Sequence, residues 1–199
     1  GLFNIGAAGQ YTLGAYGALY CAIMLKMPWY VCLIVATILG GIWGAIPGFF
    51  KAYFNINEVI TSIMFNWIGL YLVNELIYQN GTGPMYDVRN TRTLNLSKNA
   101  EFAQSIIPDF GLNKMFQTNS TTIAIFLAAA VAILIWVILN KTTFGYELKA
   151  VGFNRDASRY AGINEKRNII MSMVIAGAIA GMAGGLLYLA GTGKHIEIK

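Results

Sequence analysis

The sequence predicts an all-α protein, a polytopic transmembrane helix bundle with about five spans. The first observation is composition: 56% of the 199 residues are hydrophobic and only 12% are charged, about half the charged share of a soluble domain. The second is that the windows 1–25, 27–50, 115–140 and 168–193 contain no Asp, Glu, Lys or Arg. Each window is longer than the roughly 20 residues that a spanning helix needs.

The predicted spans follow from these windows and from a further uncharged stretch between Glu58 and Glu75. Together they form one transmembrane domain over residues 1–199. Because residue 1 lies inside an apolar segment with no initiator Met before it, we expect this domain to be partial, with further helices elsewhere in a longer protein. We place the spans at roughly 7–25, 29–50, 57–78, 120–140 and 167–190.

The segment before the first span carries the amides Asn4 and Gln10 together with Gly6 and Gly9. Such residues are poor material for a regular, lipid-exposed helix, because polar groups are costly in the bilayer and irregular backbone is tolerated only inside protein. We therefore predict a broken or re-entrant segment that lines a cavity. Asn4 and Gln10 are candidates for a substrate path.

Two predicted spans carry glycines at i+4 spacing, which lets helix backbones approach closely. The alternative is that glycine is simply frequent in membrane helices, but two uninterrupted triplets favour tight packing. The first span has a looser series of the same kind in Gly14, Ala18 and Ala22. The triplets are Gly40, Gly44 and Gly48 in the second span, and Gly177, Gly181 and Gly185 in the last.

The third span begins with polar residues that we also assign to the candidate substrate path. Asn57, Thr61 and Asn66 recur at near-helical spacing, and Glu58 lies one step round the helix. For Glu58 two interpretations stay open. It is either an interfacial carboxylate near Lys51 that reaches the headgroups, or a polar contact to substrate or to a partner helix.

The two long loops set the predicted orientation. Loop 141–166 and the adjoining Arg167 carry six Lys and Arg residues, against four in loop 79–118. The positive-inside rule therefore makes 141–166 cytoplasmic and 79–118 extracytoplasmic. The outer loop is polar and rich in turn residues, and we expect it to cap or shield a cavity.

The cytoplasmic loop 141–166 has signals for short helices. Asn154 is a favourable N-cap and Gly162 is a natural C-terminal stop. These signals predict a helix of about two turns over residues 155–161. Asn164 can then cap the helix that follows.

Several classes of site are excluded by what the sequence lacks. His195 is the only histidine, which excludes a multi-histidine metal site, and Cys21 and Cys32 fit buried small hydrophobes. We find no catalytic cluster, no phosphate-binding loop sequence and no cofactor motif. The net charge of +5 lies mainly in loops, which indicates topology and acidic-lipid contact and not nucleic-acid binding.

Three stretches in order resemble one family of membrane permeases. FNIGAAGQ at 3–10 resembles its FNIGxxGQ signature, NEVITSIMFN at 57–66 its NEVIxTIMLN segment, and FGYELKAVGFNRDASRYAGI at 144–163 its cytoplasmic coupling segment. The family is the branched-chain amino acid, monosaccharide and nucleoside permeases of ABC importers, and the pattern is most similar to its nucleoside branch. Ala8 stands where a Glu is frequent, and Phe65 where a Leu is frequent.

The resemblance implies an ATP-driven importer in the bacterial inner membrane. Its expected partners are cytoplasmic ABC ATPase subunits, a second permease subunit and an extracytoplasmic substrate-binding lipoprotein. This chain would form the translocation path for nucleosides or similar small polar solutes, while ATP hydrolysis would occur on the partner. The residues that the resemblance and the helix signals assign to ATPase coupling are Gly152, Asn154, Arg155, Ala157, Arg159, Tyr160 and Gly162.

Three alternatives are weighed against this function. A sugar or branched-chain amino acid permease would share the architecture and differ in substrate. A secondary transporter or channel would favour titratable residues inside the membrane for ion coupling, and only Glu58 qualifies. A membrane enzyme would need a cluster of nucleophile, base or metal ligands, which the few acids and one histidine argue against.

Overall fold

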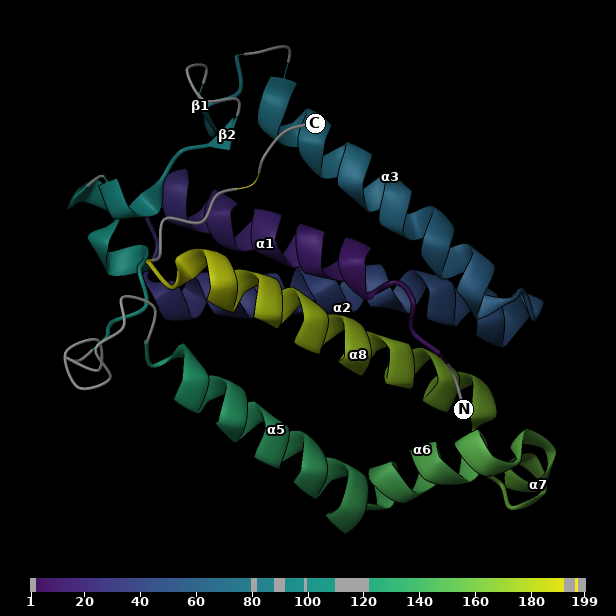
Figure 1. Cartoon of the computed structure of the whole chain (residues 1–199). Coiled ribbons are helices and arrows are strands. Elements are labelled where there is room, and N and C mark those ends of the chain that lie inside the picture. The colour runs from purple at the N-terminus through teal and green to yellow at the C-terminus, as the bar shows by residue number, and fades with distance from the viewer. Residues whose placement is uncertain are drawn as a thin grey trace.

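The computed structural model is an assembly of long helices joined by short ones (Figure 1). It describes residues 3–79, 82–87, 92–98, 100–109, 122–191 and 196. By length and composition, α2, α3, α5 and α8 can each cross a membrane, and α1 is shorter at 17 residues. The predicted helical bundle is therefore confirmed. The helices are α1 (Ala7–Ile23), α2 (Trp29–Phe54), α3 (Glu58–Tyr78), α5 (Ala124–Lys141), α6 (Thr143–Phe153), α7 (Arg155–Tyr160) and α8 (Glu165–Leu189).

The core of the bundle is formed by α1, α2 and α8, and glycines bring their backbones together. A Cβ atom at Gly40 would lie 2.4 Å from the carbonyl oxygen of Gly177, and one at Gly14 would lie 2.3 Å from the Cα of Gly181. At such distances only glycine fits. The glycine series predicted from sequence thus face one another across α2 and α8, with α1 packed on both.

Local signals explain why α3 and α8 begin where they do. The side chain of Asn57 accepts a hydrogen bond from the amide of Val59 at 2.9 Å, and Asn164 accepts one from Arg167 at 3.1 Å. Each asparagine therefore satisfies an amide in the first turn that has no partner within its helix. Between α2 and α3, Asn55 adopts a left-handed conformation with φ of 54°, which ends α2 and lets the chain reverse.

α5 packs its first turn against the core through Ala124 and Leu127, and every one of its residues keeps at least partial exposure. α5 and α8 are farthest apart at the end where α6 and α7 connect them and lie nearer each other at the opposite end (Figure 1). An apolar groove of about 380 Å³ lies between them, lined by Ala128, Val131, Ala132, Ile135, Ile179, Met182, Ala183 and Leu186.

The described part of loop 79–118 lies at the end of the bundle opposite α7 (Figure 1). It contains the strands β1 (Tyr86–Asp87) and β2 (Arg92–Thr93), which pair antiparallel, and the 3-10 helices η2 (Leu96–Lys98) and η3 (Ala100–Ser105). Residues 110–118 of the predicted loop lie outside the described residues.

Polar contacts attach η3 to the turn between α1 and α2. Ser105 donates to the carbonyl of Met27 at 2.6 Å, and Lys26 forms an ion pair with Glu101 at 2.6 Å. The hydrogen bond and charge of Lys26 hold the pKa of the exposed Glu101 carboxyl below its ordinary value. Contacts from η3 therefore fix the α1–α2 turn at this end of the bundle.

Candidate functional site

The predicted irregular segment before α1 is held together by its own amides. Asn4 and Gln10 form a reciprocal pair: the Asn4 Nδ2 donates to Gln10 Oε1 at 2.8 Å, and the Gln10 Nε2 donates to Asn4 Oδ1 at 3.2 Å. Asn4 Oδ1 also accepts from the amide of Gly6 at 3.1 Å. Gln10 is buried, with 1% of its surface exposed. The segment folds back on itself before the helix starts at Ala7.

Asn66 of α3 fastens this segment to the third span. Its Oδ1 accepts from the amide of Gly9 at 2.8 Å, and its Nδ2 donates to the carbonyl of Ile5 at 2.9 Å. The contact favours glycine, because a Cβ at Gly9 would lie 3.0 Å from the Cα of Asn66 and would require a small shift of α3. One amide thus satisfies two backbone groups on either side of the start of α1.

Lys51 and Glu58 form an ion pair of 2.9 Å that joins the last turns of α2 to the first turn of α3. Only 23% and 16% of their side chains are exposed. This ion pair fits both interpretations of Glu58, an interfacial carboxylate near Lys51 and a polar contact to a neighbouring helix. Asn57 and Thr61 instead stabilise the start of α3, where the Thr61 hydroxyl donates to the Asn57 carbonyl at 3.0 Å.

A cavity of about 400 Å³ brings part of the predicted substrate path into contact with the predicted coupling segment. Asn4 and Glu58 line it together with Gly152 and Arg155. Gln10, Asn57, Thr61 and Asn66 are not among the lining residues. The remaining residues of the lining come from the end of α2, from α6 and from the first half of α8: Lys51, Leu148, Val151, Phe153, Asn168, Ile169, Ser172, Met173 and Ala176.

Asn168 and Ser172 of α8 are cavity residues that sequence reasoning did not identify. Their i+4 spacing as polar residues in an otherwise uncharged span was the available signal. Asn168 is 1% exposed. Its Nδ2 donates to Glu147 of α6 at 3.1 Å, and within the described part of the chain its Oδ1 has no hydrogen-bond partner. A buried acceptor therefore lines the cavity.

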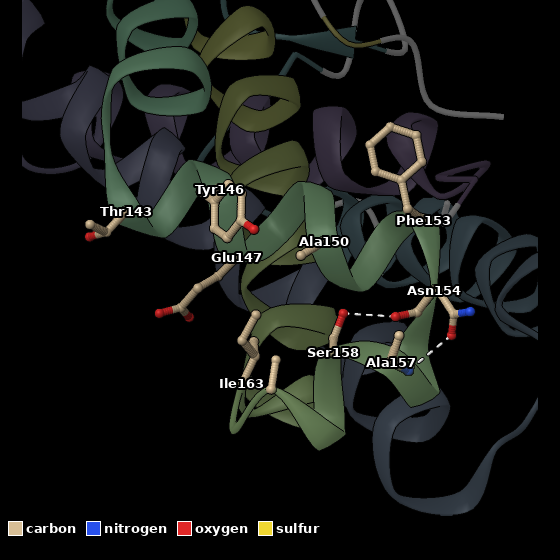
Figure 2. A pocket seen from close by; sticks show the side chains of 10 residues that line it. Thr143, Tyr146, Glu147, Ala150, Phe153, Asn154, Ala157, Ser158 and Ile163 are labelled. Atoms are coloured by element: carbon tan, nitrogen blue, oxygen red, sulfur yellow. Dashed lines mark hydrogen bonds between the residues drawn. The ribbon is translucent and has the colours of Figure 1, made fainter.

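The coupling segment folds as two short helices, α6 and α7, that meet at Asn154 (Figure 2). The Asn154 side chain accepts from the amide of Ala157 at 3.0 Å, and the Ser158 hydroxyl donates to the Asn154 carbonyl at 2.7 Å. Gly162, with φ of 78°, follows the end of α7 in the left-handed conformation. The structure thus has the helix that the capping signals predict, with α7 ending at Tyr160.

The outer surface of this helical pair is aromatic and exposed. Tyr160 is 94% exposed and Phe153 90%, and Arg159 is also exposed. Beside them a groove of about 530 Å³ runs between α6 and α7 (Figure 2). It is lined by Thr143, Tyr146, Glu147, Ala150, Phe153, Asn154, Ala157, Ser158, Ala161 and Ile163.

Two coupling candidates differ from the others in their surroundings. A Cβ at Gly152 would meet nothing within 4 Å, and Gly152 faces the cavity. Arg155 is only partly exposed, since its guanidinium contacts Glu165 at 2.6 Å. The coupling role that the resemblance implies for Arg155 stays a prediction, and it would require the part of the side chain that remains exposed. Arg159 and Tyr160 keep the exposure that such a role needs.

The side chains around the cavity are hydrogen-bonding groups and ion pairs. Within the residues that the structure describes, no cluster of three or more His, Cys, Asp and Glu side chains could hold a metal ion. The polar groups are amides, a hydroxyl, the partly buried Lys51–Glu58 pair and the guanidinium of Arg155, which can donate and accept hydrogen bonds to a small polar molecule.

Comparison with known proteins gives a consistent picture. The family model described as branched-chain amino acid transport system, permease component, matches residues 1–198. The guanosine ABC transporter permease protein of Bacillus subtilis is 36% identical over all of this chain and 55% of its own length. The nucleoside ABC transporter permease protein of Lactococcus lactis is 36% identical over 94% of this chain and 52% of its own length.

A more distant relative is the glucose ABC transporter permease protein of Haloferax volcanii, 29% identical over 96% of this chain and 51% of its own length. The chain therefore spans about half the length of these relatives. No solved structure matches the chain significantly.

Proposed function

We propose that this chain forms part of the membrane path of an ATP-driven importer, because it belongs to the family of branched-chain amino acid transport system permease components. The observation that carries the proposal is the cavity in which Asn4 and Glu58 of the bundle meet Gly152 and Arg155 of the coupling segment. In such an importer the coupling segment, which the cytoplasmic ATPase moves, must contact the solute path, and the cavity supports a contact of this kind.

For the substrate we propose nucleosides or similar small polar solutes. Two relatives named for guanosine and nucleosides are 36% identical to this chain, the one named for glucose is 29% identical, and another one named for nucleosides is 25% identical. The cavity lining combines amides, a hydroxyl and an ion pair with the apolar side chains of Ile169 and Met173. Such a mixture suits a small solute that has a hydroxylated sugar and a planar base with polar edges.

For the partners we propose cytoplasmic ABC ATPase subunits that receive α6 and α7, a second permease subunit, and an extracytoplasmic substrate-binding lipoprotein. The proposed location is the inner membrane of a bacterial cell, with 141–166 on the cytoplasmic side. Exposed Tyr160, Phe153 and Arg159 support an ATPase contact, because aromatic and arginine side chains are favoured at the centres of protein interfaces.

In this proposal the chain itself performs no chemistry. ATP hydrolysis on the partner moves α6 and α7, and the cavity at the foot of α8 changes shape. Asn168 and Ser172 offer hydrogen bonds to the solute, while the Lys51–Glu58 pair gives the cavity wall both a donor and an acceptor. The amides of Asn4, Gln10 and Asn66 hold the irregular segment that borders this path.

The test is reconstitution of the complete permease with its ATPase and its binding protein in proteoliposomes. We expect uptake of labelled guanosine that requires ATP and the binding protein, with glucose and leucine taken up poorly. Preferred uptake of glucose or leucine would instead favour the sugar or amino acid alternative. Uptake driven by an ion gradient in the absence of ATP would contradict the proposal and favour a secondary transporter.

A further inference from the structure

The guanidinium of Arg155 lies where three parts of the chain meet. Its Nε donates to Oε2 of Glu165 at 2.6 Å and its Nη2 to Oε1 of the same carboxylate at 3.5 Å. Its Nη1 makes a long contact of 3.5 Å with Oδ1 of Asn55. The side chains of Arg155 and Glu165 are 35% and 15% exposed. The contact is partly buried and consists of one short and one long hydrogen bond to the same carboxylate.

The positions of these residues in the fold give the contact its meaning. Arg155 is the first residue of α7, Glu165 is the first residue of α8, and Asn55 is the left-handed residue that ends α2 before α3 begins. The guanidinium therefore connects the short helix to the feet of three long ones. A fork of two N–H groups on one carboxylate fixes orientation as well as distance.

The same residues border the cavity. Arg155 lines it together with Lys51 and Glu58, which flank Asn55 along the chain, and with Asn168, one turn of α8 beyond Glu165. A helix moves as a rigid unit over such distances. A displacement of α7 that pulls Glu165 therefore shifts the wall of the cavity that α8 provides.

Resting on the proposed function, we infer that Arg155 is a positioning residue that transmits movement of α7 to α8 and to the α2–α3 turn. Arg155 acts inside the chain, whereas the exposed Arg159 and Tyr160 face outward from the same helix. The hydrogen bond from Asn168 to Glu147 at 3.1 Å ties α6 to α8 in parallel. Breaking the arginine contact leaves α7 joined to the foot of α8 through residues 161–164 but without the ion pair that fixes their relative position.

The test measures how much guanosine is taken up per ATP hydrolysed by the full reconstituted importer. Arg155→Glu places two carboxylates together, and we expect the ratio to fall about tenfold, the size of effect typical of contacting pairs. ATP hydrolysis itself is expected to continue. Glu165→Arg should act likewise, and the double variant Arg155→Glu/Glu165→Arg should recover at least half of the ratio, because the ion pair is restored with its partners exchanged.

Two further variants separate linkage from folding. Arg155→Lys keeps the charge without the fork, and we expect it to lower the ratio about threefold. Lys26→Gln breaks an ion pair at the opposite end of the bundle, and the ratio should stay at the wild-type value.

Distinct results overturn the two proposals. If the wild-type importer shows no ATP-driven uptake, the proposed function fails, and this inference fails with it. If the wild type is coupled and Arg155→Glu or Arg155→Lys keeps the wild-type ratio, the inference alone fails. It also fails if the double variant melts at the wild-type temperature but remains as uncoupled as the single variants.

Discussion

At the scale of single residues, the amides of this chain serve the backbone as much as any ligand. Asn4 and Gln10 bond to each other, and Asn66 bonds to the backbone at Ile5 and Gly9. In a bilayer the backbone groups of an irregular segment find no water, so side chains must satisfy them. Asn168 differs, because its buried Oδ1 has no hydrogen-bond partner among the described residues, although the residue lines the cavity.

Asn66→Leu tests the role of the amide that fastens the segment to α3. The substitution leaves the amide of Gly9 and the carbonyl of Ile5 without their side-chain partners. We expect a loss of about 2 kcal/mol in the free energy of unfolding, measured by thermal or denaturant unfolding in detergent. Uptake should fall as well, because the segment borders the proposed path.

Thr37→Val is the matched control for Asn66→Leu. The Thr37 hydroxyl donates to the carbonyl of Leu33 at 2.7 Å. Because that carbonyl also accepts a hydrogen bond within the helix, removal of the hydroxyl leaves no backbone group without a partner. Its melting temperature should stay close to that of the wild type. Equal stability of the two variants would contradict the role given to Asn66.

At the scale of helices, the contact between α2 and α8 depends on individual glycines, and two neighbours make a sharp test. A Cβ at Gly40 would lie 2.4 Å from the Gly177 carbonyl oxygen and 2.6 Å from the Gly181 Cα, both backbone atoms. At Gly41 the nearest atom would be 3.5 Å away, an ordinary contact. Gly40→Ala must push the helices apart, whereas Gly41→Ala need not.

We therefore expect Gly40→Ala to cost about 1–3 kcal/mol, the usual range for overpacking in a close-packed interior. Gly41→Ala should be neutral or slightly stabilising, because alanine is the better helix former. Melting of the two purified variants side by side provides the measurement. A Gly40→Ala protein as stable as Gly41→Ala would show that α2 and α8 are less closely packed than described.

The helices themselves were predictable because their signals are local. Uncharged windows locate the long helices, and the predicted caps Asn154 and Asn164 start α7 and α8. The cap that Asn57 forms at the start of α3 was not predicted, because its polarity was assigned to the substrate path. Tight packing was predictable from the glycine series. Which helix faces which was not, because i+4 spacing marks a face without naming its partner.

Contacts between distant segments account for what the sequence left open. The Arg155–Glu165 fork and the Asn66 clamp depend on how chain segments fold back in space. Charge and polarity marked these residues as important without showing whether they bond within the chain. The cavity-lining positions on α8 were missed for the same reason, since the i+4 spacing of Asn168 and Ser172 gains meaning only once α6 and the end of α2 lie beside it.

At the scale of the whole molecule, the two long loops occupy opposite ends of the bundle (Figure 1). At one end, η3 is attached to the α1–α2 turn by the ion pair between Lys26 and Glu101. The other carries α6 and α7 with their exposed aromatic side chains. The greater number of cations in 141–166 predicts that the second end is cytoplasmic. This polarity places the proposed ATPase contact and the proposed binding-protein contact on opposite faces of the membrane.

Single introduced cysteines test this polarity in the complete permease. Tyr160→Cys and Glu101→Cys place thiols at exposed sites on the two ends, while the native Cys21 and Cys32 are 4% and 0% exposed and give a low background. In intact cells an impermeant maleimide should label the cysteine at 101 and leave that at 160 unmodified. In inverted vesicles the pattern should reverse, because the positive-inside rule places loop 141–166 in the cytoplasm. Labelling of both positions from one face would contradict a path that crosses the bilayer between them, and exchanged labelling would place the coupling helices outside, where no ATPase could reach them.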